Sequence, residues 1–352
     1  MFIFVFPVAL VILFGFALRL QLHDVTMAVY DQDRQFPSMM VKDRFDREGY
    51  LVPVEVGSLK ELRKWIDTGK ARAGLHIPAD FSAKLIENQQ PHLTLYIDGT
   101  MPTIALAIDN KSGTIRQSDF ERSLYFEDPD GPEKILADDP FKLDVVTLYN
   151  PDLIDAWFFL PAIVGLLILQ VGLILTSTAV VREKESGTLE QIIVTPVSKL
   201  GFILGKIGPY AAVSFADFYL IVFVAHLLFH VPMAGSQWTL LASALVYIPS
   251  VAGLGLLIST FAETQQQAIF LSVFILLPSV LLSGFIFPVD AIPWLIRPLS
   301  YLIPLTYFLE IIRGVMLKGS GLVDLWSPFL VLAGFTVAFV WACAYRFRKT
   351  LP

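Results

Sequence analysis

The chain has 352 residues, of which 55% are hydrophobic and 16% are charged, and its net charge is −6. Soluble domains contain roughly 25% charged residues, so this composition excludes an ordinary soluble protein and indicates an integral membrane protein. No basic patch points to nucleic acid as a partner. The single cysteine, Cys343, excludes an internal disulfide and a metal site built from cysteines.

Residues 1–18 form an apolar run that is just long enough to cross a bilayer. A signal peptide is the alternative, but it would need a positively charged start and a small-residue cleavage site, and the run has neither. We therefore predict a first transmembrane helix over residues 1–18.

Residues 19–155 form an acidic region with 16 basic and 24 acidic residues. Short β-rich runs alternate there with amphipathic helical runs, which is typical of a compact α/β domain. The pattern predicts a helix at about 102–127, a linker rich in proline and aspartate at 128–140, and a last strand around 142–149.

Three aspartates in this region, Asp31, Asp33 and Asp98, follow β-rich runs. Carboxylates are ligands for hard cations, so a metal site is one interpretation. Acidic residues in the turns that end strands are the commoner explanation.

Five further apolar segments are long enough to be transmembrane helices. They are residues 157–180, 207–229, 238–261, a segment that begins after Gln265–Gln267, and residues 325–345. Polar side chains at membrane depth usually face protein or a cavity, which makes them candidates for a translocation pathway. The candidates are Gln170, Thr176, Asp217, Gln265 and Gln266. Hydrogen bonding between helices remains an alternative for Gln170, and a structural clamp remains one for Asp217.

Residues 181–206, VREKESGTLEQIIVTPVSKLGFILGK, are a charged interruption between two of these segments. Charges of both signs precede an apolar stretch, which predicts an exposed loop with a short helix on the membrane surface. We interpret the loop as a docking surface, and an ordinary solvated connection is the alternative. The candidate docking residues are Arg182, Glu183, Lys184, Glu185, Gly187, Thr188, Glu190, Gln191 and Pro196.

Residues 286–320 are apolar but contain four prolines, so they cannot form one regular helix. The prolines are Pro288, Pro293, Pro298 and Pro304. A pair of short re-entrant or interfacial helices fits better, forming an outer hairpin. Within it, Glu310 and Arg313 are three residues apart and could share one helix face as a neutralised pair.

Basic residues in short loops set the orientation of a membrane protein. One side would hold seven: Arg182, Lys184, Lys199, Lys206, Arg346, Arg348 and Lys349. The other side would hold three: Arg297, Arg313 and Lys318. This asymmetry predicts that the 181–206 loop and both termini are cytoplasmic and that residues 19–155 are extracytoplasmic.

The string REKESGTLEQIIVTP followed by LGK resembles the cytoplasmic loop between the second and third spans of type-2 ABC exporter permeases. The phrases LLISTFAETQQQA and LLSGFIFP, within residues 256–288, and residues 300–319 resemble the same family. The subfamily with a large extracytoplasmic domain between its first two spans shows similar turns in that domain. The resemblance covers the whole chain, although relatives usually have a cytoplasmic leader that this sequence lacks.

The resemblance implies an α-helical integral membrane protein of the bacterial cytoplasmic membrane, with six transmembrane helices and an inserted α/β extracytoplasmic domain. Residues 156–352 would form the five-helix part of the membrane domain. Two permeases, identical or paralogous, would pair with two ABC ATPase subunits, and the loop at 181–206 would couple them. Membrane lipids and a periplasmic adaptor protein are further expected partners.

The chain itself contains neither the phosphate-binding G-x-x-x-x-G-K-[ST] nor the ABC signature LSGGQ. We therefore expect no enzymatic activity and no cofactor in this chain, with ATP and Mg²⁺ bound by the partner ATPase. Two other classes compete with the exporter. A membrane-anchored receptor or envelope scaffold would not require Asp217 or the glutamine run, and a secondary transporter would usually show internal repeats, which we do not find. The sequence leaves the substrate open.

Overall fold

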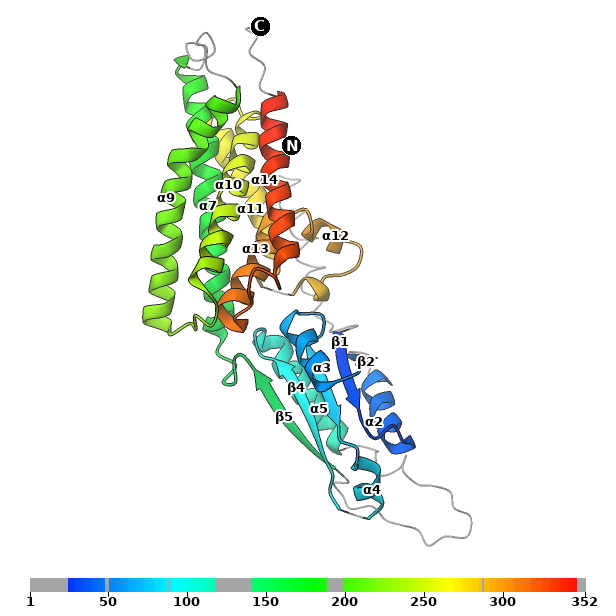
Figure 1. The fold of residues 1–352 in the computed structure, drawn as a ribbon. Helices are drawn as coiled ribbons and strands as arrows, with labels where there is room; N and C mark the ends of the chain where they lie inside the picture. Colours follow the sequence, from blue (N-terminus) through cyan, green and yellow to red (C-terminus); the bar gives the residue numbers. More distant parts are fainter. Residues whose placement is uncertain are drawn as a thin grey trace. The chain divides into compact units, whose positions relative to one another are not determined.

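The computed structural model describes residues 25–47, 51–87, 89–117, 141–188, 199–286 and 288–346. The predicted first span at 1–18, the whole predicted linker at 128–140 and the middle of the predicted docking loop at 189–198 lie outside these residues. The chain divides after Asp155 into two compact units, which are described separately below (Figure 1).

The first unit is built on a mixed sheet with the strand order β2-β1-β3-β4-β5. The strands are β1 (Val25–Asp31), β2 (Leu51–Glu55), β3 (Ala73–Ile77), β4 (His92–Asp98) and β5 (Lys142–Leu148). Strand β1 is parallel to β2 and β3, whereas β4 is antiparallel to β3 and parallel to β5. The start of β1 and the end of β5 therefore lie at the same edge of the sheet.

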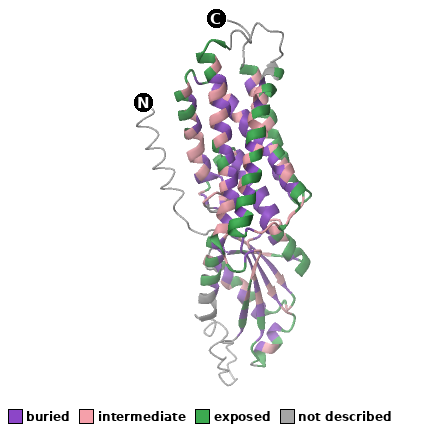
Figure 2. Ribbon diagram, turned by 90° about the vertical axis from the view of Figure 1, so that its left-hand side faces the viewer, coloured by how far each residue is buried: buried purple, intermediate pink, exposed green. Residues whose placement is uncertain are grey.

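Helices cover both faces of this sheet because successive strand residues point to opposite sides. Met27 and Val29 of β1 belong to a core shared with α2 (Phe36–Arg47), α4 (Phe81–Ile86) and α5 (Pro102–Gln117). Ala28, between them, packs with Leu62 and Ile66 of α3 (Leu59–Asp67) on the other side. Figure 2 shows buried residues along the strands. The alternation of β-rich and helical runs thus produces an α/β unit.

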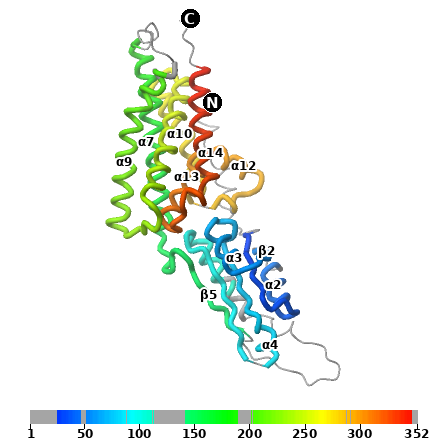
Figure 3. Tube along the Cα trace, viewed as in Figure 1, coloured from blue at the N-terminus to red at the C-terminus, as the bar shows by residue number. Residues whose placement is uncertain are grey.

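The second unit contains five helices that are long and apolar enough to cross a membrane, counted over the described residues. They are α7 (Asp155–Glu185), α9 (Lys199–Phe229), α10 (Gln237–Ser259), α11 (Gln265–Leu282) and α14 (Trp326–Arg346). Figure 3 shows α9 at the periphery of this bundle. A sixth span would have to come from residues 1–18.

The prediction of one loop over 181–206 was wrong at both ends. Residues 181–185 complete α7, and residues 199–206 begin α9. The helix continues because nothing between Val181 and Ser186 interrupts it, and it ends next to Gly187, whose φ of 71° is the left-handed conformation common after helix C-termini.

The predicted start of the fifth span was also too late. The three glutamines lie in the first turn of α11, because Thr264 is the N-cap residue and its hydroxyl accepts a hydrogen bond from the backbone N–H of Gln267 at 3.2 Å.

The proline-rich segment forms four short pieces. They are η1 (Val289–Ala291), α12 (Arg297–Ser300), α13 (Pro304–Arg313) and the π-helical turn η2 (Gly314–Lys318). Pro298 and Pro304 lie in the first turns of α12 and α13, where the missing N–H of proline costs no helical hydrogen bond.

Helix α13 packs into the centre of the second unit. Phe308 stacks on Tyr247 of α10 with ring centroids 4.0 Å apart, and the Tyr247 hydroxyl donates a 2.9 Å hydrogen bond to the carbonyl of Gly165 in α7. Glycine is required at 165, since a β-carbon there would come within 2.8 Å of the Phe308 ring. The proline-broken segment is thus part of the core of the bundle.

Candidate functional site

Six of the predicted docking residues lie in the described part of the chain, at or just after the C-terminal end of α7. Glu183 forms an ion pair with Lys206 of α9, so the two helices are joined where the connecting segment leaves them. Thr188 donates a hydrogen bond of 3.2 Å to the carbonyl of Glu183, and Arg182 is exposed. The other three candidates, Glu190, Gln191 and Pro196, lie outside the described residues.

Glu185 makes a contact that the sequence did not suggest. Its carboxylate accepts hydrogen bonds from the backbone N–H of Gln265 at 2.9 Å and from the Gln265 side-chain amide at 2.5 Å. The sequence predicts Glu185 in the docking loop and Gln265 in the pathway. The structure brings these two candidates together, although they are 80 residues apart.

The pathway candidates belong to three different helices, and no hydrogen bond joins any two of them in the described part of the chain. Gln170 is exposed on α7, and Gln266 is exposed in the first turn of α11. Asp217 is half-buried on α9, with no hydrogen bond or ion pair to another described residue. Thr176 is buried and donates a 2.6 Å hydrogen bond to the carbonyl of Gly172, so it would meet a substrate only if α7 and α10 separated.

Arg313 joins the proline-rich segment to the ends of two long helices. Only 6% of the residue is exposed. Its guanidinium donates hydrogen bonds to the carbonyls of Gly284 at 2.8 Å and of Phe285 and Phe158 at 3.3 Å, and it lies 3.8 Å from the centre of the Phe158 ring. Glu310 is exposed, and its pairing with Arg313 stays a prediction. Pro288 is the N-cap residue of η1, and Pro293 lies before the turn that leads into α12.

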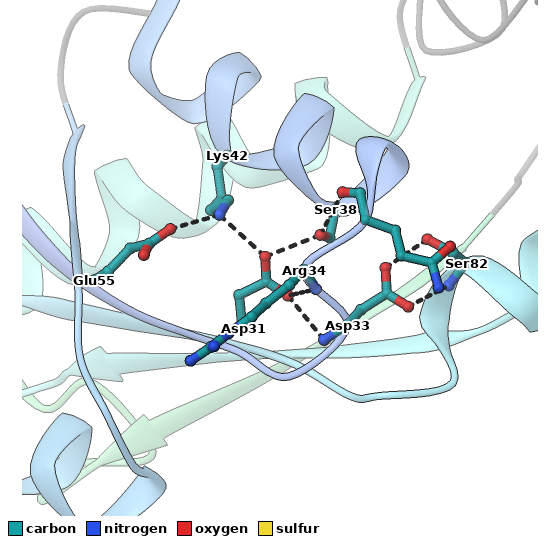
Figure 4. Close-up of polar contacts among 8 residues, drawn as sticks. Asp31, Asp33, Arg34, Ser38, Lys42, Glu55 and Ser82 are labelled. Carbon is teal, nitrogen blue, oxygen red and sulfur yellow. Dashed lines mark hydrogen bonds and ion pairs between the residues drawn. The ribbon is translucent and has the colours of Figure 1, made fainter.

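Asp31 and Asp33 of the α/β unit make hydrogen bonds in and around the turn that follows β1 (Figure 4). One oxygen of Asp31 accepts the backbone N–H groups of Asp33 and Arg34 at 3.0 Å, and the other accepts Ser38 at 2.9 Å and contacts Lys42 at 3.0 Å. Although burial opposes both shifts, hydrogen bonding holds the pKa of the Asp31 carboxyl below its usual value, and hydrogen bonds to Glu55 and to Asp31 raise the pKa of Lys42.

A metal site from these aspartates is not supported. Asp33 accepts two hydrogen bonds from Ser82, so its oxygens are occupied as well. Asp98 ends β4, which runs antiparallel to β1, and therefore lies at the opposite edge of the sheet from Asp31. Among the described residues, no three His, Cys, Asp or Glu side chains are grouped as metal ligands.

Five apolar helices long enough to cross a membrane, counted over the described residues, together with a separate α/β unit, fit a multi-pass membrane protein. The chain belongs to the ABC-2 transporter family, because residues 1–345 match the family described as "ABC-2 family transporter protein". It is therefore a transport permease.

Three relatives from Escherichia coli (strain K12) match almost all of the chain. "Probable multidrug ABC transporter permease YbhR" is 32% identical over 98% of this chain and 93% of its own length. "Probable multidrug ABC transporter permease YbhS" is 28% identical over 96% of this chain and 88% of its own. "Inner membrane transport permease YhhJ" is 25% identical over 92% of this chain and 85% of its own.

Proposed function

We propose that this chain is the membrane subunit of an ATP-driven exporter in the bacterial cytoplasmic membrane. A separate ABC ATPase binds ATP and Mg²⁺ and drives the cycle, and this chain forms the pathway with a second permease copy or a paralogue. The names of the relatives YbhR and YbhS favour drug-like organic compounds as substrates.

The observation that carries this proposal is the ion pair between Glu183 and Lys206. It fixes the end of α7 to the start of α9, so residues 186–198 connect two helix ends that are held together. A partner that pulls on this segment would therefore move two spans together. Arg182, Lys184 and Glu190 supply charges of both signs for docking, and we place this side in the cytoplasm.

The pathway proposal rests on Gln170. An exposed amide within an apolar span leaves its donors and acceptors unsatisfied if it faces lipid. A second permease packed on α7, or a water-filled route between the two copies, would satisfy it. Gln265 and Gln266 lie at the cytoplasmic entrance of α11 in this arrangement.

The test is co-purification of the ATPase with the tagged chain, combined with ATP-dependent export of ethidium from proteoliposomes. Glu190→Lys should lower ATPase recovery without removing the permease from the membrane. Glu87→Lys is the matched charge reversal, because Glu87 is exposed in the α/β unit, which we place on the other side of the membrane. Equal ATPase recovery with both variants would reject the docking role of the segment.

Exchanging the charges of Glu183 and Lys206 distinguishes a role in docking the ATPase from a role in holding α7 and α9 together. Glu183→Lys alone should loosen the two helices and lower export, whereas Glu183→Lys with Lys206→Glu should restore it by reforming the ion pair. Absence of any ATPase in the wild-type preparation would instead favour a receptor or scaffold with a ligand-binding outer domain.

A further inference from the structure

Helices α7 and α11 meet along three successive turns. Ser177, Val181 and Glu185 are four residues apart and so share one face of α7. They contact, in order, Ser272, Ala268 and Gln265 of α11. The two serine hydroxyls are 3.2 Å apart, and Val181 and Ala268 are buried in one small apolar cluster.

The last of these contacts differs in kind from the other two. Gln265 is the first residue of α11, and the backbone N–H groups of a first helical turn have no partner within their own helix. Glu185 accepts this N–H and also the Gln265 side-chain amide. A carboxylate is also the charge that a helix N-terminus favours. Glu185, a residue of α7, therefore caps the N-terminus of α11.

The same turn of α7 is attached on two sides. Lys184 donates a 3.2 Å hydrogen bond to the carbonyl of Ala262, in the turn that leads into α11. Glu183 is paired with Lys206 of α9. Residues 183–185 thus connect the start of the docking segment with both neighbouring helices.

We propose that Glu185 is a positioning residue that transmits movement of segment 186–198 to the start of α11. This inference rests on the proposed function, in which the ATPase moves that segment. When the end of α7 moves, the two hydrogen bonds oblige the first turn of α11 to follow. The Ser177–Ser272 contact lies about two turns further along α11, and the Lys184 hydrogen bond and the apolar contact hold Ala262 and Ala268, so of these contacts Glu185 alone holds the first residue of the helix directly.

The test measures movement of α11 and requires no knowledge of the substrate. Phe270 of α11 is 75% exposed, so Phe270→Cys in a Cys343→Ala chain is a suitable reporter. The complex with its ATPase is labelled with N-ethylmaleimide without nucleotide and after trapping with ATP and vanadate. We expect the two labelling rates to differ about 5-fold or more, the lower range of allosteric coupling, and to become equal in Glu185→Ala while ATP is still hydrolysed.

Two variants show whether the contact itself is responsible. Glu185→Gln with Gln265→Glu exchanges the amide and the carboxylate, and should restore the labelling difference. Glu263→Ala is the matched control. The Glu263 carboxylate is exposed, lies two residues before Gln265 in the chain and makes no hydrogen bond within the described residues. If Glu185→Ala lowers the yield of folded complex, Gln265→Ala removes only the side-chain bond and should give an intermediate labelling difference.

An unchanged labelling difference in Glu185→Ala, or in Gln265→Ala if that variant is needed, would overturn the inference. A failed exchange variant would do the same, as would a wild-type complex that hydrolyses ATP without altering labelling at position 270. The proposed function would survive each of these results. A wild-type chain that binds no ATPase would reject the proposed function and this inference together.

Discussion

Gly255 of α10 faces Thr176 of α7 so closely that a β-carbon on the glycine would lie 1.8 Å from the threonine Oγ1. Small residues permit this approach of two helix backbones, as is common between membrane helices. Gly255→Ala should therefore destabilise the protein by about 1–3 kcal/mol, the usual cost of overpacking. The thermal unfolding midpoint of the purified chain in detergent measures this effect.

Thr176→Ala provides the partner test for that contact. It removes the hydroxyl, but the β-carbon of residue 176 stays 3.1 Å from the new methyl group at 255, so the double variant should recover only part of the loss. Equal stability of Gly255→Ala and wild type would mean that the two helices are not in this contact.

Arg313→Lys should lower stability by about 1.5–3 kcal/mol, the range for hydrogen bonds to a charged group. A lysine keeps the charge but lacks the planar fork that reaches three carbonyls at once. Arg297→Lys is the matched control, since Arg297 also donates to two backbone carbonyls but is partly exposed. Similar shifts of the unfolding midpoint for both would contradict a special role for Arg313.

Asp217→Asn and Asp217→Leu should both leave the yield of folded protein near that of wild type, because Asp217 has no bonded partner among the described residues of its own chain. If the carboxylate serves the pathway, ethidium export per folded complex should fall about 10-fold in both, equivalent to 1.4 kcal/mol, and Asp217→Glu should retain it. Low yield of both variants would instead indicate a structural clamp, with a second chain as the source of the partner.

Orientation can be tested with single cysteines in a Cys343→Ala background. Thr103 in the α/β unit and Glu263 before α11 are both exposed, and neither side chain makes a hydrogen bond in the described part. An impermeant thiol reagent added to cells with a permeable outer layer should label Thr103→Cys and not Glu263→Cys. The reverse pattern would invert the proposed topology.

The α/β unit should lose stability in acid through Asp31. Because its folded pKa is lowered, Asp31 stabilises the unit above its unfolded pKa of about 3.9 and loses this contribution as the pH falls further. Lys42, with its raised pKa, contributes at all pH values below about 10.4. The unfolding midpoint of Asp31→Asn should therefore lie below that of wild type at pH 7 and approach it below pH ~4. A difference that does not depend on pH would contradict this.

The apolar segments and the α/β alternation could be predicted because length and periodicity are local properties of a sequence. The helix ends were less accurate, although local signals were present. Thr264 followed by Gln267 is a capping pattern, and Gly187 is a typical residue after a helix end.

The contacts that organise the candidate site could not be predicted in this way. Glu185 and Gln265 are 80 residues apart, and Arg313 and Phe158 are 155 apart. A single sequence carries no information on which distant residues pair. The aspartates for which a metal site was one interpretation show the same limit, because Asp31 and Asp98 both end strands and only the opposite directions of β1 and β4 place them at opposite ends of the sheet.

Strand β1 starts and β5 ends on the same side of the sheet, which keeps the two ends of the α/β unit close together. Two strands lie between these ends, so they are separated by about three strand spacings, or ~14 Å. A bridge of about five residues would cover that distance. A short linker of this length, or another domain whose ends are equally close, would therefore join the residue before β1 to the residue after β5 over the same distance.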